Sequence, residues 1–361
     1  MKSKSLNKII GQNIKIALKE TGITQQQLSS KLNISRQTLN NYITGSTIID
    51  FKKMLAIADI TDKSLDFFYK QDKSAKNYKF RSDIPIDYVL KIKFAEKIKK
   101  YNEIEEINCI QLCKLKLEYN LDKFDKEKIK NIAEKTRRLF NISPYGPISN
   151  PVYELEKNDI KIIQFPAQNR VISGFSESNE KFGDCIYINS EITVERRYFT
   201  AIHELAHLIF HKSDYIKDLR VENEKLKEQI ADEFAGHFLI PSKALKDILE
   251  ANFIKKISYE DVIYLKRFFN VSAKCMVRRI FKESVINSKE HEYLNDKIDS
   301  IVNIYSEPEP IEEYKHVQNY RFNNLVKKAY IEGKINVTKV AELLEITVLD
   351  ADKKVKKWLS N

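Results

Sequence analysis

The stretch from Arg196 to His211 constrains the chain more than any other. It contains no Gly or Pro and its apolar residues recur at helical spacing, so we expect a helix. His203 and His207 project from one face about one turn apart and can share a zinc ion through neutral imidazole nitrogens. Glu204 is then expected beside the metal, as the base that deprotonates the metal-bound water. Without a third ligand, the two histidines could simply be hydrogen-bond partners.

The stretch Glu228–Pro241, also helical in spacing, can supply that third ligand. Glu228 and Asp232 are four residues apart on one face, beside two alanines small enough for two helices to approach closely. We therefore expect Glu228 to bind the metal and Asp232 to hydrogen-bond a ligand histidine. Glu224 and Glu233 are rival third ligands, but they share this face less well.

These motifs resemble the ImmA/IrrE family of zinc metallopeptidases over residues 120–285. The matching runs are His203-Glu-Leu-Ala-His, Glu228-x-x-Ala-Asp-x-Phe-Ala, Leu239-Ile-Pro, Arg196-Arg-Tyr-Phe-Thr and Ile186-Tyr-Ile-Asn. The resemblance implies zinc held by two His and one Glu, and some members cleave repressor proteins. The chain departs from the usual pattern at Ile230 and His237, and neither is an expected ligand.

Composition limits the class of protein. The chain has 361 residues, which is long enough for two or three domains. Hydrophobic residues make up 42% of it, which is enough to form their cores. It has no long uncharged apolar run and no apolar core of a signal peptide near its N-terminus. The four cysteines lack metal-type spacing, which is typical of reduced thiols. We therefore expect a cytoplasmic protein without a membrane partner.

The positive charge is concentrated near the N-terminus. The net charge is +11, and residues 1–80 carry 14 Lys and Arg against 6 Asp and Glu, while the remainder carries 48 against 45. This imbalance favours a polyanionic partner for the N-terminal segment.

Residues 6–45 have the pattern of a helix-turn-helix. A helix over residues 6–20 ends at Gly22, and Thr24 with Gln27 forms a capping box for a second helix. Ser35 caps a third helix after a tight turn, and Gly45 ends it. Two short helices joined by a three-residue turn, the second polar outside, predict a DNA-binding motif.

This segment resembles the XRE, or lambda-repressor, type of DNA-binding domain as far as about residue 70. The resemblance implies sequence-specific binding to a double-stranded DNA operator, as a homodimer on a palindrome. Base edges in the major groove would be met by Arg36, Gln37 and Asn41, with Asn40 close by, and phosphates by Gln25 and Thr44.

The remaining chain reads as connectors, a small sheet and a helical tail. Residues 71–85 are expected to be a linker, and the charged residues 212–227 a wall of the cleft. Three strands, 160–165, 171–175 and 184–189, predict a small antiparallel sheet with one face covered by helices. The resemblance to metallopeptidases implies that the last strand is an edge that can pair with an extended substrate, and the alternative is that 184–189 is an ordinary structural strand. After a break at 306–310, helices are expected at 320–331, 336–344 and 348–359. The last two have the spacing of a helix-turn-helix, but we expect these helices to pack as a small bundle and not to contact DNA.

The expected fold is α+β and mainly α, with a lambda-repressor-like domain, a zincin-like core around a small sheet, and a C-terminal helical tail. The expected domains are 1–70 for DNA binding, 71–120 as linker and helical connector, 121–285 as metallopeptidase, and 286–361 as C-terminal helical segment.

Together these features predict a transcriptional regulator with a zinc-dependent endopeptidase that cleaves a repressor-type protein or the chain itself. The alternative is a catalytically silent transcription factor that uses the peptidase fold as a sensor or dimerisation module. Glu204 favours the first hypothesis, because a pure sensor needs no general base. The group that would stabilise the oxyanion stays open among Tyr187, Tyr198 and Tyr215.

Overall fold

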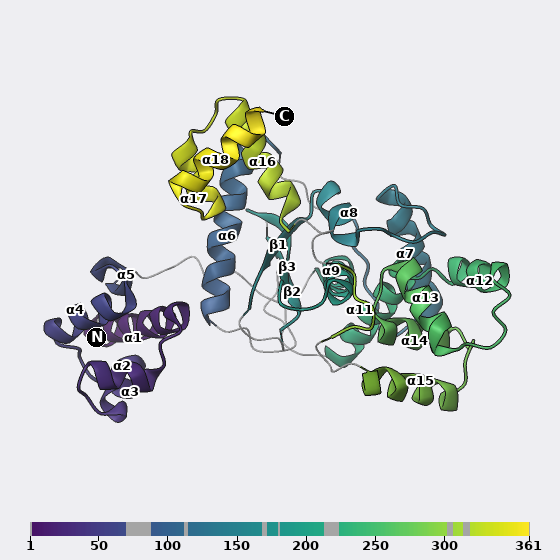
Figure 1. Cartoon of the computed structure of the whole chain (residues 1–361), viewed down its shortest axis with the longest axis horizontal. Helices are drawn as coiled ribbons and strands as arrows, with labels where there is room; N and C mark the ends of the chain where they lie inside the picture. The colour runs from purple at the N-terminus through teal and green to yellow at the C-terminus, as the bar shows by residue number, and fades with distance from the viewer. Residues whose placement is uncertain are drawn as a thin grey trace. The chain divides into compact units, whose positions relative to one another are not determined.

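The computed structural model describes residues 2–69, 88–111, 115–167, 172–179, 181–212, 224–301, 306–312 and 318–360. The chain divides into two compact units, Met1–Asn77 and Tyr78–Asn361. Both are mainly helical, and the second contains a three-stranded sheet, so the fold is α+β and mainly α (Figure 1). The expected linker, residues 71–85, and residues 213–223 of the expected cleft wall lie outside the described residues. No helix in the described ranges is long and apolar enough to cross a membrane.

The described helices of the first unit are α1 (Lys2–Thr21), α2 (Gln25–Lys31), α3 (Arg36–Thr44), α4 (Phe51–Thr61) and α5 (Leu65–Tyr69). The expected capping box is confirmed: Thr24 Oγ1 accepts the Gln27 N–H at 3.2 Å, and Gln27 Oε1 accepts the Thr24 N–H at 2.8 Å. Ser35 caps α3, and Gly45 ends it at a left-handed φ of 73°.

The first unit has a hydrophobic core of its own, which includes Ile14, Leu28, Leu39, Ile57 and Phe68. Gly11 of α1 lies directly against the end of α3. A Cβ at this position would be 2.3 Å from the carbonyl oxygen of Ile43, so a larger residue would push the two helices apart.

The sheet of the second unit consists of β1 (Lys161–Phe165), β2 (Gly174–Asn179) and β3 (Gly183–Asn189), in the order β1-β3-β2. β1 pairs with β3 in parallel, and β2 pairs with β3 antiparallel. The expectations of a fully antiparallel sheet and of an edge strand at 184–189 were therefore wrong. All seven residues of β3 are buried, as is typical of a central strand covered on both faces.

Different helices cover the two faces of the sheet. Ile162, Ile186 and Ile188 face a core built with α9 (Val194–Phe210). The other helices of this layer are α7 (Lys126–Leu139), α8 (Pro151–Lys157), α11 (Glu224–Leu239), α12 (Ser242–Ala251), α13 (Tyr259–Phe269), α14 (Ala273–Lys282) and α15 (Ser288–Ile301). α15 contributes Leu294 and Ile298 to this core, although residue 286 was the expected start of the tail.

The opposite face, with Ile163, Phe175 and Tyr187, packs against α6 (Tyr88–Ile107) and the last three helices. These are α16 (Tyr320–Ile331), α17 (Val337–Leu344) and α18 (Val348–Leu359). The expected C-terminal helices are therefore confirmed, but they share a core with the sheet and do not form a bundle on their own (Figure 1).

Candidate metal centre

Helix α9 carries two histidines whose rings face each other. The ring centroids of His203 and His207 lie 4.8 Å apart, and their Nε2 atoms are 3.1 Å apart. His207 is buried and His203 is partly exposed, so the pair lies at the border of the core. This follows from the local sequence, because a spacing of four residues on a helix brings two side chains together.

Helix α11 packs against α9 and contributes a carboxylate to the same point. Glu228 Oε2 lies 3.0 Å from His203 Nε2, and Glu228 Oε1 lies 3.2 Å from His207 Nε2. Ala231 and Ala235 are fully buried between neighbouring helices, which agrees with the close approach expected of small side chains.

The donor set fits a zinc ion. Three ligand atoms at tetrahedral corners, each about 2.0–2.1 Å from zinc, would lie about 3.3 Å apart, close to the separations of the Nε2 and Oε atoms here. His203, Glu204 and His207 also offer atoms within 4.8 Å of one another, which makes Glu204 a rival ligand. Glu204 Oε2, however, accepts the hydroxyl of Ser176 at 2.6 Å, while both Glu228 oxygens face the histidines. We therefore favour Glu228.

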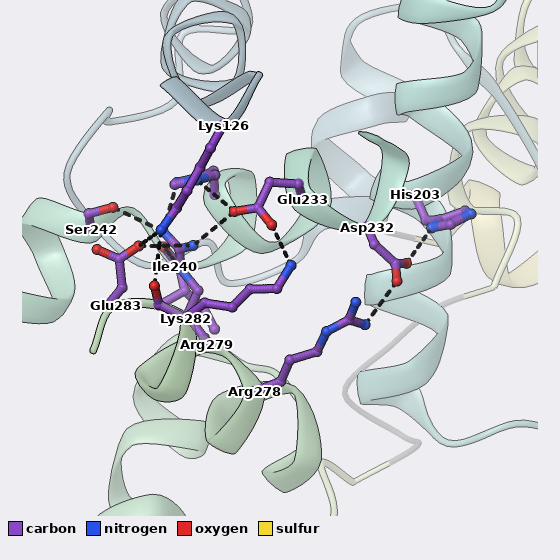
Figure 2. A network of polar contacts seen from close by, with 11 residues as sticks. Lys126, His203, Asp232, Glu233, Ile240, Ser242, Arg278, Arg279, Lys282 and Glu283 are labelled. Carbon is purple, nitrogen blue, oxygen red and sulfur yellow. Dashed lines mark hydrogen bonds and ion pairs between the residues drawn. The ribbon is translucent and has the colours of Figure 1, made fainter. Parts of the chain in front are cut away.

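The second ring nitrogen of each histidine also has a partner. His203 Nδ1 lies 3.1 Å from Asp232 Oδ1, and the other oxygen of Asp232 accepts from Arg278 Nη1 at 2.8 Å (Figure 2). His207 Nδ1 lies 3.0 Å from Nδ1 of His211. Such contacts fix the orientation of ligand rings.

The sequence offered two roles for His211, one turn past His207: capping the helix end, which we favoured, or lining the cleft. His211 is the C-cap of α9, and its ring also contacts His207. Sequence reasoning did not assign Arg278 to this site. No local signal marks Arg278, because it comes from α14.

The electrostatics favour positive charge at this point. Burial alone lowers the pKa of His203, but the contacts with Asp232 and Glu228 outweigh burial and raise the pKa to about 10. Burial opposes ionisation of Glu228, yet the two histidines hold the pKa of its carboxyl well below its usual range. Carboxylates thus surround the imidazoles, an environment that suits a proton or a divalent cation.

Glu204 is buried beside the histidines and close to the sheet. A Cβ on Gly174 of β2 would be 2.4 Å from Thr200 Cγ2, so glycine permits the close approach of α9 to β2. That approach brings Ser176 within hydrogen-bond distance of Glu204. The sequence indicated Glu204 but not its serine partner.

The rival carboxylate Glu233 faces a different group of residues (Figure 2). Its Oε1 lies 3.1 Å from His237 Nε2, its Oε2 accepts from Lys282, and Arg279 is nearby. This buried network joins α11 to α14, and it explains why Glu233 is directed away from His203. Glu224 lies in the first turn of α11, one turn before Glu228.

Two of the three tyrosines considered for the oxyanion have other surroundings. Tyr187 lies on the opposite face of the sheet and donates to the carbonyl oxygen of Phe165 at 2.9 Å. Tyr198 is buried in the core around α9. Tyr215 lies outside the described residues.

The expected DNA-contacting residues share one polar surface of α3, with one member on α2. Leu39, Tyr42 and Ile43 are buried on the other side of α3. The residues on the polar side are Arg36, Gln37, Asn40 and Thr44, which are exposed, and Asn41, which is half-buried, while Gln25 at the start of α2 is also half-buried.

The fold and the site define two kinds of domain, a helix-turn-helix and a metallopeptidase fold. Residues 14–68 match the helix-turn-helix family model, and residues 155–281 match that of the IrrE N-terminal-like domain. The chain thus carries an XRE-type helix-turn-helix domain and an IrrE/ImmA-like peptidase domain, which confirms both resemblances.

One curated protein that is similar to part of this chain is named as a transcriptional regulator. The "uncharacterized HTH-type transcriptional regulator YqaE" of Bacillus subtilis (strain 168) is 34% identical over 68 residues, which is 19% of this chain and 59% of that protein. The chain therefore covers less than two thirds of that relative.

Two solved structures were also matched. They are Bacillus thuringiensis PlcR with the peptide PapR7 and DNA, and apo ComR from S. Thermophilus, each 12% identical. The alignments cover 98% and 99% of this chain and 100% of each structure, with TM-scores of 0.19 and 0.17, from which no argument about the fold follows.

Proposed function

We propose that this DNA-binding regulator uses its second unit as a zinc-dependent endopeptidase. The observation that carries the proposal is the convergence of His203 Nε2, His207 Nε2 and Glu228 at 3.0–3.2 Å, with Glu204 beside them. The described residues bring three ligands together beside a buried carboxylate, an arrangement that suits catalysis, whereas a structural zinc site is closed by a fourth protein ligand.

The residues have distinct roles in the proposed peptide hydrolysis. His203, His207 and Glu228 would hold zinc, which supplies Lewis-acid polarisation of a carbonyl and lowers the pKa of water. Glu204 accepts a proton from the attacking water and later donates it to the leaving amine. The Ser176 hydroxyl, 2.6 Å from Glu204 Oε2, orients that carboxylate. Asp232 and Arg278 hold the ring of His203.

An extended substrate would pair with β2. β2 is an edge strand, and its Ser176 contacts Glu204, so a peptide added along this edge would pass the proposed base. The substrate we propose is a repressor-type protein or the chain itself, and the helix-turn-helix would bring the peptidase to the operator. A homodimer on a palindromic operator is part of this proposal.

The metal ligands can be tested by zinc analysis of full-length protein. Wild type should contain about one zinc per chain, and Glu228→Ala should lose it. Glu224→Ala is the matched control, because it removes the rival carboxylate one turn earlier on α11. Zinc retained in Glu228→Ala but lost from Glu224→Ala would show that the wrong carboxylate was chosen.

The activity can be tested with Glu204→Gln, which should keep zinc and DNA binding and remove the base. Cleavage should fall by about 10²–10⁴-fold. Wild-type and variant strains should therefore differ in cleaved proteins and in regulated genes. If both strains give the same cleavage products and the same expression, the catalytically silent sensor replaces this proposal.

A further inference from the structure

A cavity of about 90 Å³ lies in the second unit on the side of the sheet opposite the metal centre. Its lining residues come from α6, β1, the start of α16 and the end of α17. The apolar part of the wall includes Ile163, Phe322, Leu343 and Leu344. The rest of the wall is polar, so the cavity combines an apolar side with polar groups that could fix the orientation of a small molecule.

The charged groups of this cavity are two lysines that hold one carboxylate between them. Lys97 Nζ lies 2.7 Å from Glu345 Oε2, and Lys100 Nζ lies 3.0 Å from Glu345 Oε1. Each lysine thus takes one oxygen of the same carboxylate. Both lysines stay partly exposed, so a molecule from solvent can reach them.

Glu345 holds this carboxylate from an unusual backbone position. It caps the end of α17 at a left-handed φ of 56°, a conformation in which Gly or Asn is the common choice. A side chain with a Cβ is strained there. The position therefore brings a carboxylate to Lys97 and Lys100 at some cost to the backbone.

We propose that this cavity binds a small organic carboxylate, and that Glu345 occupies the place of the ligand's carboxylate in its absence. The ligand's carboxylate would take the two lysines, and its apolar body would lie against Phe322 and Leu343. At about 10–15 Å³ for each water-sized position, the cavity has room for roughly six to nine heavy atoms. Short aliphatic and single-ring aromatic carboxylates fit, and nucleotides do not. Binding does not depend on the peptidase activity.

Binding would also change the C-terminal helices. Glu345 lies in the turn between α17 and α18, so a ligand that displaces its carboxylate releases this turn from α6. The proposed ligand is thus an effector of this part of the regulator.

The test is calorimetry on the full-length protein with benzoate and hexanoate, with benzamide as the neutral partner of benzoate. We expect saturable binding of a carboxylate with a Kd of about 1 mM, and at least about tenfold weaker binding of benzamide. Glu345→Gln removes the internal competitor and should tighten binding about tenfold. Misfolding cannot mimic a gain in affinity.

The lysines are tested with Lys97→Met/Lys100→Met, which should abolish binding, and with Lys99→Met, a control on an α6 lysine outside the cavity lining. The proposal is overturned if neither carboxylate binds Glu345→Gln at about 10 mM. It is also overturned if Lys99→Met weakens binding as much as the double variant, or if sulfate binds as well as benzoate, since either result indicates a general attraction of anions.

Discussion

The helix pairs α2–α3 and α17–α18 follow the same plan with different exposed chemistry. Each pair begins at a side-chain cap, turns through a residue with positive φ, and starts its second helix at a Ser or Thr cap. The two pairs can be aligned residue by residue without an insertion or deletion. The matched positions are Thr24 and Asn336, Leu28 and Val340, Asn33 and Glu345, Ile34 and Ile346, Ser35 and Thr347, and Leu39 and Ala351.

The outer face of the second helix is where the two pairs differ. Arg36 and Gln37 of α3 correspond to Val348 and Leu349 of α18, which are 51% and 65% exposed. Base edges are recognised by hydrogen-bonding side chains, which α3 has and the start of α18 lacks. Caps and core thus produce the helix-turn-helix shape in both pairs, whereas the proposed DNA contacts belong to the exposed positions of α3.

The two pairs also differ in what supports them. The first packs into a core confined to residues 10–68. The second shares its core with α6 and the sheet, and an ion pair links it to α6, since Lys339 Nζ of α17 lies 2.5 Å from Glu103 Oε1. The first pair should therefore unfold with its own unit, and the second only with the sheet.

Truncation of a buried core side chain should show most clearly whether the two units unfold independently. Leu28→Ala should destabilise the first unit by about 2–5 kcal/mol, and Val340→Ala the second by about 2 kcal/mol. Trp358 in α18 is the only tryptophan, so its fluorescence reports on the second unit alone, while circular dichroism reports on both. Leu28→Ala should leave the Trp358 transition unchanged. An equal shift in both signals would mean that the chain unfolds as one.

Binding to an operator, selected by the full-length protein from random DNA, should distinguish the two second helices. Arg36→Ala should weaken binding by about 1–3 kcal/mol and relax specificity at one base pair. Val348→Ala, at the matching position of α18, should leave the affinity unchanged. Equal losses on selected and random DNA would mean that Arg36 contacts only phosphate.

A buried carboxyl should make the second unit sensitive to pH. Glu156 of α8 accepts the backbone N–H of Arg321 at the start of α16, and burial raises its pKa from 4.5 to about 7. The folded form keeps a proton that the unfolded chain releases, so the free energy of unfolding should fall as pH rises from 4.5 to 7.

Glu156→Gln should remove this loss, stabilising the second unit by about 2 kcal/mol at pH 8 and hardly at pH 4. Urea unfolding followed by Trp358 fluorescence measures it. Glu154→Gln on the same helix is the control and should keep the wild-type pH profile. A profile that stays steep in Glu156→Gln would assign the effect to another group.

The smallest expected changes in stability concern the N-caps of the second helix in each pair. Ser35 Oγ accepts the Thr38 N–H at 3.0 Å, and Thr347 Oγ1 accepts the Asp350 N–H at 3.1 Å. Ser35→Ala and Thr347→Ala should each cost about 1 kcal/mol, the first in the first unit and the second in the Trp358 transition. No loss in Thr347→Ala would show that the two caps are not equivalent.

Much of the candidate site could be predicted because its signals are local. The spacing of His203 and His207 determines that their rings meet on one helix face, and the same holds for Glu228 and Asp232 on α11. Predicting that the two helices pack together needed a further inference, that the small alanines of α11 allow a close approach. Arg278 and Ser176 could not be found in this way, because they come from α14 and β2 and no pattern near them refers to α9.

The sequence alone determined the helix-turn-helix, its caps and the zinc-type helix, because each depends on residues within a few positions of one another. Tertiary structure alone decided the order of the strands and the place of the last three helices. The alternation of Tyr187 and Asn189 with Ile186 and Ile188 indicated one covered face, whereas helices cover both. Which face a strand exposes depends on burial by distant segments, and here α6 together with residues 320–359 covers the second face of the sheet.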